Sequence, residues 1–519
     1  MLAIAHSAVL AGIESSPVRV EIQAERGIPT FELVGLAEAA VRESRVRVKS
    51  ALAGVGVDIS EFRVTVNLAP ADVKKSGSSF DLAIALGTLV ALGVLPEGTL
   101  DDVLVLGELS LNGNVQNLRG VVAHLLGAKK RGVARAIVPF ANEREAALVD
   151  GVEVELASTL AEVVDALCGR ASLRTPRPAP ADVVRRPVDD LADVRGQHGA
   201  RRALEIAASG GHNLLMMGPP GAGKTMLARR LPGILPLLTR EEALEVIAIH
   251  GVAGLVGSAS SVAVERPFRA PHHTASDVAL VGGGEHARPG EVSLAHHGVL
   301  FLDELAELRR TALEALRQPL EDGTVTICRM RMTLTFPARP MLIGATNPCP
   351  CGNFGDGTNR CNCSHEAIRS YRRRLSGPLL DRVDLHVVLP RVDLRELHAT
   401  GGGEPSAAVR ARVEKARAVQ HARFRAGEVA AQTNAHLAQR DVERICKLDT
   451  KGRALLAQAV ERRGLSARAY GKVLRVARTI ADMDGATAIA PGHVVEAVAG
   501  RVLDRDQSNG RPISETDAA

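Results

Sequence analysis

The order of apolar and polar positions divides the chain into three parts that can each form a core. Residues 1–170 and 191–390 alternate strand-like apolar runs, such as Arg63–Leu68, with stretches of helical period, such as Ser79–Leu92. This alternation predicts two α/β domains, the second with a parallel sheet and crossover helices. Residues 391–505 have a helical period and predict a C-terminal domain of helices.

Two further segments have compositions that do not form a hydrophobic core. Residues 171–190 combine prolines with arginines, which predicts a stiff, solvated linker. The prolines are Pro176, Pro178, Pro180 and Pro187. Residues 506–519 show no apolar period, and we expect a disordered tail there.

The length of 519 residues exceeds what one core can hold and predicts three or four domains. The net charge of +5 is modest, so charge alone does not establish a nucleic-acid partner. The chain has no Trp and only Tyr371 and Tyr470, which leaves few rings on which bases could stack. If DNA is bound, we expect contacts to its backbone to dominate.

The sequence predicts a cytoplasmic protein without a membrane partner. Its longest apolar stretch, Leu82–Leu95, contains Gly87 and Gly93 and is shorter than the roughly 20 residues of a membrane span. We expect a buried helix and turn there. The N-terminus lacks the basic leading segment of an export signal. Seven cysteines in a reducing compartment argue against a disulfide framework.

An eight-residue run after the apolar segment 213–217 fits the phosphate-loop pattern in full and predicts binding of a nucleoside triphosphate, ATP. The run is Gly218, Pro219, Pro220, Gly221, Ala222, Gly223, Lys224 and Thr225. Its glycines let backbone N–H groups and the start of the next helix point at the phosphates. Lys224 supplies a charge, and the Thr225 hydroxyl supplies a ligand for Mg²⁺. The alternative is a glycine turn with an incidental lysine.

The run Gly298–Glu304 is an apolar strand that ends in two carboxylates, and it resembles the Walker B element of AAA+ ATPases. Asp303 is then expected to hold Mg²⁺, and Glu304 to orient and polarise the attacking water. A second apolar run ends in Asn347, which resembles the sensor 1 residue that contacts the γ-phosphate or the water. The alternative for Asp303 and Glu304 is a pair that caps the next helix.

Two arginines resemble residues that complete such sites. Residues 379–385 resemble the segment that carries the arginine finger, which implies that Arg382 reaches the γ-phosphate of the neighbouring subunit. The alternative is a surface pair with Asp381 or Asp384. Arg468 opens a helix that resembles sensor 2 of the lid. An arginine that acts on a partner's nucleotide implies a ring, and we expect a homohexamer.

A segment between the two ATPase elements extends the resemblance to nearly the whole chain. Residues 266–276, followed by 282–284 and 288–293, are similar to an insertion found in the magnesium-chelatase-like YifB/ComM family, where it points toward the ring pore. The resemblance implies that Arg269 and His272 contact DNA. The alternative is that the histidines of this loop are structural.

Residues 323–336 alternate with period two on both sides of a basic centre, which predicts a β-hairpin. Its position matches the pore hairpin of the same superclass, where Arg329 and Arg331 would track phosphates without reading sequence. The alternative is a solvated hairpin tip. In the helical domain, residues 409–425 form an amphipathic basic helix, for which a solvated face is the ordinary interpretation.

Four cysteines lie close together directly after Asn347, as two Cys-x-Cys pairs. The pairs are Cys349 with Cys351 and Cys361 with Cys363. Four thiols so close in a reducing compartment predict a structural Zn²⁺ site that pins this loop. Free thiols are the alternative.

Residues 75–82 and 107–139 resemble the proteolytic domain of Lon, which uses a serine activated by a lysine. Alignment places Gly77 at the serine and Val122 at the lysine, so neither member of the dyad is present. We expect a non-proteolytic module, as in RadA, which this domain also resembles.

The leading hypothesis is therefore an α/β protein with a Lon-protease-like N-terminal domain, an AAA+ phosphate-loop core and a helical lid. It would hydrolyse ATP to move on single-stranded or branched DNA, and the family resemblance implies branch migration during recombination and uptake of foreign DNA. A chelatase-type remodeller of a protein partner is the alternative, which the Lon-like domain disfavours. An ATP-dependent protease is opposed by Gly77 and Val122.

Overall fold

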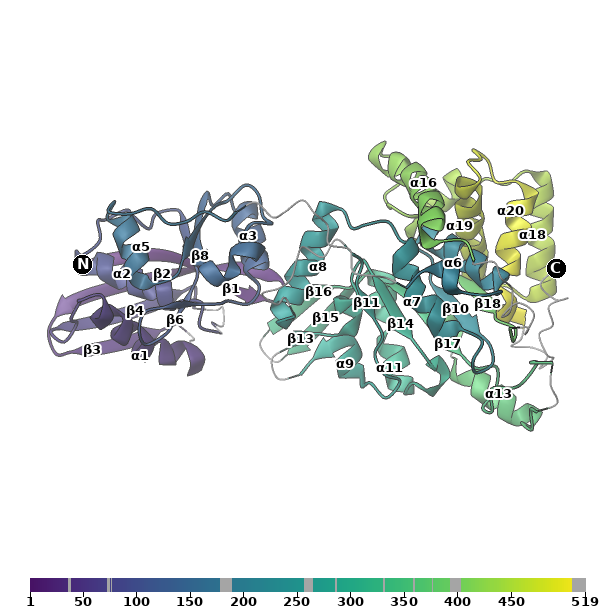
Figure 1. Cartoon of the computed structure of the whole chain (residues 1–519), viewed down its shortest axis with the longest axis horizontal. Coiled ribbons are helices and arrows are strands. Elements are labelled where there is room, and N and C mark those ends of the chain that lie inside the picture. Colours follow the sequence, from purple (N-terminus) through teal and green to yellow (C-terminus); the bar gives the residue numbers. More distant parts are fainter. Residues whose placement is uncertain are drawn as a thin grey trace.

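The computed structural model describes residues 1–35, 39–71, 75, 77–177, 189–255, 265–284, 287–329, 332–357, 360–375, 377–392 and 403–505. Figure 1 shows an N-terminal α/β domain, a central α/β domain and a group of helices arranged along the long axis of the molecule. The mixed α/β architecture with a helical C-terminal region confirms the expected fold class. The expected tail, residues 506–519, lies outside the described residues.

The N-terminal domain is built on a seven-stranded mixed sheet. In spatial order its strands are β3 (Thr30–Val34), β4 (Phe62–Ala69), β2 (Glu14–Arg26), β1 (Leu2–Ala11), β5 (Val103–Val105), β8 (Arg135–Pro139) and β9 (Glu153–Ala157). Strands β1 and β2 pair antiparallel, with Ala5 opposite Val20, while β5, β8 and β9 run parallel to β1. Alternate residues of β2 are buried, which matches the period of a strand with one covered face.

Helices cover this sheet. They are α1 (Ala39–Gly54), α2 (Asp81–Ala91), α3 (Val121–Lys130), α4 (Glu143–Ala146) and α5 (Leu160–Leu167). Every residue of α2 is buried, so the expectation of a buried helix at 82–95 is confirmed. Gly87 lies where α2 approaches the sheet, because a Cβ there would collide with Ile22.

The expected linker begins inside this domain. Leu173 is buried, and the guanidinium of Arg174 lies 5.1 Å from the centroid of the Phe140 ring. The backbone N–H of Leu156 donates to the carbonyl of Arg174. Leu173 and Arg174 therefore attach the start of the expected linker to the N-terminal domain, while most of residues 171–177 are exposed as expected. Residues 178–188 lie outside the described part of the chain.

The central domain contains a five-stranded parallel sheet. Its strands, in spatial order, are β11 (Phe268–Arg269), β14 (Val299–Leu302), β17 (Met341–Thr346), β10 (Leu214–Met217) and β18 (Leu385–Val388). All residues of β10, β14 and β17 are buried, as expected for a parallel sheet covered on both faces. The flanking helices include α6 (His198–Gly210), α7 (Lys224–Ile234), α8 (Arg240–Ala253), α9 (Asp277–Val281), α10 (Glu291–Leu294), α11 (Arg310–Ala315), α12 (Arg317–Asp322), α13 (His365–Arg374) and α14 (Gly377–Leu380).

The predicted hairpin forms from β15 (Thr324–Arg329) and β16 (Met332–Pro337), which pair antiparallel. A shorter pair, β12 (Gly282–Gly283) and β13 (Arg288–Pro289), lies in the preceding insertion. The hairpin contacts the N-terminal domain, because Phe336 and Leu334 pack with Ala11 and Ile13. Its base is therefore anchored between two domains.

Helix α8 makes the second contact between the domains. Its residues Ile247 and Ala248 join one apolar cluster with Val121, Val122 and Leu125 of α3. In Figure 1, α8 lies on the side of the central domain that faces the N-terminal domain. The apolar face of α8 thus belongs to the core of the neighbouring domain.

The helical domain consists of α16 (Ser406–Arg425), α17 (Gln439–Ile445), α18 (Thr450–Arg463), α19 (Ala467–Met483) and α20 (Pro491–Ala499). A fully buried carboxylate, Asp482, organises its centre. Asp482 accepts hydrogen bonds from Arg478 Nε at 3.0 Å, Arg423 Nη1 at 2.9 Å and Asn434 Nδ2 at 2.8 Å. Arg478 is itself 2% exposed, so its charge is compensated inside the protein.

We expect the substitution Asp482→Ala to destabilise the helical domain by about 3–5 kcal/mol, because it leaves two guanidinium groups without their buried partner. Hydrogen exchange of α19 and urea unfolding followed by circular dichroism measure the change. Asp484→Ala is the matched control, since that side chain is 53% exposed and its Oδ2 lies 3.1 Å from Nε2 of His493. We expect its effect to stay below about 1 kcal/mol. Equal effects of both substitutions would contradict the assignment.

Candidate nucleotide site

The phosphate-loop sequence lies between strand β10 and helix α7. Gly221 and Gly223 have φ values of +78° and +91°, a region that favours glycine. A Cβ at Gly218 would lie 2.7 Å from the carbonyl oxygen of Leu389, so only glycine fits that position. The loop can therefore wrap tightly and direct its backbone N–H groups toward one point.

Lys224 begins α7 and closes the loop on itself. Its Nζ donates to the carbonyls of Gly218 at 2.6 Å and Pro219 at 3.0 Å, and to Asn347 Oδ1 at 3.0 Å. Burial lowers the pKa of the Lys224 ammonium, and the charges of Asp303 and Glu304 act in the opposite direction. These three carbonyl oxygens accept the N–H groups of Lys224 that the phosphate oxygens of a triphosphate could accept instead.

Thr225 and Asp303 form the oxygen pair expected of a magnesium site. Thr225 Oγ1 donates to Asp303 Oδ2 at 2.7 Å, and Asp303 Oδ1 accepts the backbone N–H of Glu304 at 2.9 Å. Hydroxyl and carboxylate oxygens are the ligands that Mg²⁺ prefers, and the ion keeps waters and phosphate oxygens in its other positions. The donor set fits the ion.

Sheet topology explains why these residues meet. Strands β14, β17 and β10 are parallel neighbours, with Leu302 opposite Gly344 and Thr346 opposite Met217. Their carboxyl ends therefore lie at one edge of the sheet, where open α/β sheets bind ligands. Asp303 and Asn347 directly follow β14 and β17 and reach the phosphate loop from there.

Glu304 has a partner that the sequence did not reveal. Its Oε2 lies 2.9 Å from Nδ1 of His273, and its backbone has φ +49°, unusual for a residue other than glycine. The His272 ring lies against that of His273, with centroids 4.1 Å apart. While Glu304 Oε2 contacts His273, this oxygen has one fewer lone pair that can accept a hydrogen bond from a water molecule. No local pattern signals the pair, because the two residues are 31 positions apart.

The two arginines expected to complete the site have other neighbours within this chain. Arg382 Nη2 lies 2.5 Å from Glu321 Oε1, and its Nε donates to the carbonyl of Arg317 at 3.1 Å. Arg468 is 65% exposed and lies 3.9 Å from Asp381 Oδ2. The structure therefore groups Lys224, Thr225, Asp303, Glu304 and Asn347, and it places Arg382 and Arg468 in separate surroundings.

The residues expected to contact DNA differ in the contacts that they make within the chain. Arg269 makes a bidentate pair with Glu291, at 2.6 and 2.7 Å, which neutralises its charge within the chain. His272 is exposed, and its Nδ1 lies 2.9 Å from Thr274 Oγ1. Arg329 ends strand β15 at the tip of the hairpin, and Arg331 lies outside the described residues.

The basic helix α16 is solvated only in part, because several of its arginines bond groups of neighbouring elements. Arg410 Nε donates to the carbonyl of Gly233 at 2.8 Å, and Arg417 Nη2 donates to that of Ala208 at 2.8 Å. Arg412 pairs with Glu205 at 2.5 Å, and Arg423 pairs with Asp482. The expectation of a solvated face was therefore wrong for Arg410, Arg417 and Arg423, which are half-buried and bond backbone carbonyls or a buried acid. Arg412 is exposed as expected.

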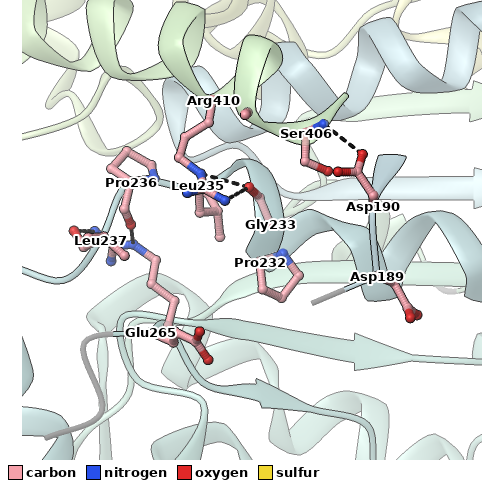
Figure 2. A pocket seen from close by; sticks show the side chains of 12 residues that line it. Asp189, Asp190, Pro232, Gly233, Leu235, Pro236, Leu237, Glu265, Ser406 and Arg410 are labelled. Carbon is pink, nitrogen blue, oxygen red and sulfur yellow. Dashed lines mark hydrogen bonds between the residues drawn. The ribbon is translucent and has the colours of Figure 1, made fainter. Parts of the chain in front are cut away.

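A cavity of about 220 Å³ lies at the carboxyl end of α7, remote from the phosphate loop at the other end of that helix. Figure 2 shows hydrogen-bonded pairs that border it, among them Arg410 with Gly233, and the backbone N–H of Ser406 with Asp190 at 2.9 Å. These contacts attach the start of α16 to the central domain. The cavity therefore lies at the interface between the central domain and the helical domain.

The four cysteines come together as expected from their spacing. Sγ of Cys349 lies 3.4 Å from Cys351 and 3.8 Å from Cys361, and Cys351 and Cys361 are 3.7 Å apart. Cys363 belongs to the same group, in which all sulfurs lie within 4.8 Å of one another. A backbone N–H of Asn353, helped by the neighbouring thiols, lowers the pKa of Cys351 to about 7. A soft metal ion fits this donor set.

A second group, Glu245, His296 and His297, is a hydrogen-bonded cluster. Nε2 of His296 and His297 lie 2.9 and 2.8 Å from Glu245 Oε2. Nδ1 of His296 accepts the backbone N–H of Arg339 at 3.1 Å, so the proton of this ring sits on Nε2 and is donated to Glu245. A metal ligand would need that nitrogen free of its proton. Hydrogen bonds from both rings lower the pKa of Glu245.

The two described serines that follow Gly77, and Lys75, already have hydrogen-bond partners. Ser78 Oγ donates to Glu108, Ser79 Oγ donates to the carbonyl of Ala8 at 3.4 Å, and Lys75 Nζ donates to the carbonyl of Pro70. Val122 is buried in α3.

Among the described residues, no helix is long and apolar enough to cross a membrane.

Three family models match successive parts of the chain. Residues 190–397 match "Magnesium chelatase, subunit ChlI", residues 20–142 match "Subunit ChlI of Mg-chelatase", and residues 403–501 match "Magnesium chelatase, subunit ChlI C-terminal". The N-terminal match carries a chelatase description, so this domain does not by itself separate the chain from the chelatases, contrary to our expectation. The same region is similar to Lon protease 2 of Bacillus subtilis, with 28% identity over 146 residues, 27% of this chain and 26% of the relative.

Two relatives are similar along nearly their whole length. The uncharacterized protein YifB of Escherichia coli is 42% identical over 506 residues, which cover 97% of this chain and 98% of the relative. The competence protein ComM of Haemophilus influenzae is 43% identical over 515 residues, with the same coverage. The chain therefore belongs to the magnesium-chelatase-like YifB/ComM family of AAA+ proteins.

Proposed function

We propose that this chain is an ATP-hydrolysing ring motor that acts on DNA as a branch-migration helicase in recombination and uptake of foreign DNA. One observation carries the ATPase part: Lys224, Thr225, Asp303 and Asn347 are joined by hydrogen bonds at one edge of a parallel sheet. Phosphoryl transfer depends chiefly on such placement of charges around the phosphates. The DNA part rests on the family and on the basic hairpin.

In this proposal the loop N–H groups and Lys224 bind the β- and γ-phosphates, and Lys224 exchanges its carbonyl partners for phosphate oxygens. Thr225 and Asp303 hold Mg²⁺, which neutralises phosphate charge when bound. Glu304 leaves His273 and orients the attacking water, and Asn347 contacts the γ-phosphate or that water. The contact between His273 and Glu304 favours a resting site that turns over slowly.

The ring part of the proposal assigns Arg382 to the nucleotide of the neighbouring subunit. To act there, Arg382 exchanges Glu321 for a γ-phosphate, and its planar cation stabilises charge in the transition state. Arg468 reaches the nucleotide when the helical lid closes, and its 65% exposure leaves it free to move. A homohexamer with six such interfaces is the expected assembly.

DNA is expected to pass along the hairpin, where Arg329 and Arg331 contact phosphates, with His272 as a further contact. Arg269 contributes little, because Glu291 neutralises it. The name of the relative ComM, a competence protein, supports a role connected with DNA uptake. The cofactors of this proposal are ATP, Mg²⁺ and a structural Zn²⁺ on Cys349, Cys351, Cys361 and Cys363.

We expect Glu304→Gln to keep ATP binding but to lower the ATP hydrolysis rate by about 10²–10⁴-fold, because the water loses its general base. Lys224→Ala should lose ATP binding. Glu307→Gln is the matched control, since this carboxylate is exposed at 43% and pairs with Arg374. Nucleotide titration and phosphate release, without DNA and with single-stranded, duplex or branched DNA, measure these effects.

The same assay separates the alternatives. If no DNA changes the rate and none is bound in the presence of ATP, the motor does not act on DNA. Stimulation by a protein partner alone would favour the chelatase-type remodeller. ATP-dependent peptide cleavage would favour a protease.

The double substitution Arg329→Ala and Arg331→Ala should weaken DNA binding about equally for all sequences, because phosphates are the proposed targets. We expect the slope of log affinity against log salt to fall by about 2, one for each lost phosphate contact. Basal ATP hydrolysis should not change. Lys451→Ala, an exposed residue of α18, is the control. An unchanged salt slope would assign the hairpin tip to solvent.

A further inference from the structure

The four sulfurs near Asn347 lie within 4.8 Å of one another, and three of them are spaced as around a bound tetrahedral metal. Zn–S bonds of about 2.3 Å in a tetrahedron place the sulfurs about 3.8 Å apart. The distances of 3.4, 3.8 and 3.7 Å among Cys349, Cys351 and Cys361 cluster around that value. A disulfide would instead bring two sulfurs to about 2.05 Å. Within the described residues all seven cysteines are free thiols, so the group is preorganised for a metal.

The cluster is attached to the nucleotide site from one side. Strand β17 ends at Thr346, Asn347 follows, and Cys349 comes two positions later and is fully buried. Asn347 Oδ1 accepts the hydrogen bond of Lys224 Nζ at 3.0 Å. Any movement of the cysteine loop therefore moves the amide that Lys224 contacts.

A second attachment is a direct contact with the phosphate loop. Gly352 follows Cys351 and has φ +82°. A Cβ at this position would lie 2.6 Å from Cδ and 2.8 Å from Cγ of Pro220. The backbone of the cysteine loop thus lies against the second proline of the phosphate loop, with no room for a side chain between them.

The far side of the cluster is held by α13. This helix begins just after Cys363 and is capped by Ser364, whose Oγ accepts the backbone N–H of Ala367 at 3.2 Å. Arg372 Nε donates to the carbonyl of Pro348 at 3.2 Å, and its guanidinium lies 5.3 Å from the centroid of the Phe354 ring. The cysteine loop is therefore held by α13 on one side and contacts Pro220 of the phosphate loop on the other.

We propose that Zn²⁺ bound by Cys349, Cys351, Cys361 and Cys363 braces the phosphate loop, so that ATP affinity depends on metal occupancy. Bound metal keeps Gly352 against Pro220 and Asn347 beside Lys224. Metal loss releases the loop, and the ATP site loses its preorganised form while the rest of the sheet stays folded. Cys351 is exposed, so a chelator or a thiol oxidant can reach the site. This inference rests on the proposed ATP binding.

The test uses the full-length chain with metal analysis, ATP titration and circular dichroism. We expect about one zinc per chain as purified, and at least about a tenfold rise in the ATP dissociation constant after chelation, a change of about 1.4 kcal/mol. Added Zn²⁺ should restore the affinity, and the circular dichroism spectrum should not change. The variants Cys351→Ser and Cys361→Ser should behave as the chelated protein.

Two further variants separate the brace from general damage. Gly352→Ala should keep its zinc and still lose ATP affinity, because the new Cβ collides with Pro220. Cys168→Ser, a thiol outside the cluster, should leave both zinc content and ATP affinity unchanged.

Purified protein without zinc, equal ATP affinity with and without zinc, or unfolding of the chain on chelation would each overturn the brace. Zinc-loaded protein that binds no ATP would overturn the proposed ATPase as well. If Lys224→Ala abolishes ATP binding but removal of zinc leaves the ATP affinity unchanged, only the brace is overturned.

Discussion

The hydrogen bonds of Lys224 Nζ to Gly218, Pro219 and Asn347 hold the whole central site together. They close the phosphate loop and join it to the end of the neighbouring strand β17. This contact is possible only because β10 and β17 are parallel neighbours that end at the same edge of the sheet. The pair of Thr225 and Asp303 extends the same arrangement to β14, so three strand ends, one helix start and the cysteine loop share one small volume.

An ion pair and hydrogen bonds between elements connect this site to the helical domain. Lys472 of α19 donates to Asp384 at 2.8 Å, and Asp384 also accepts the backbone N–H of Asn213 ahead of β10. Burial opposes ionisation of Asp384, but Lys472 and His212 hold its pKa below the usual range. The pair lies two positions from Arg382 and four from Arg468. A closing movement of the lid would therefore displace both arginines that the proposal assigns to catalysis.

The N-terminal domain reaches the same region by another route. Its helix α3 shares an apolar cluster with α8, and α8 also carries Glu245, which pairs with His296 and His297 just ahead of β14. The hairpin base also packs on this domain through Phe336. The N-terminal domain thus supports both the base of the hairpin and helix α8, whose Glu245 holds the two histidines ahead of β14.

The sequence by itself determined the elements and the residues that follow them. The apolar strands followed by the phosphate loop, by Asp303 or by Asn347 are local patterns, as are the buried helix α2, the hairpin and the two Cys-x-Cys pairs. Local periodicity fixes secondary structure and the edge at which a strand ends. Only the tertiary structure decided which charge meets which. Arg412 pairs with Glu205 across 207 positions, Arg382 with Glu321, Arg269 with Glu291 and His273 with Glu304. These partners come from segments that packing alone brings together, so no periodicity in the chain could have named them.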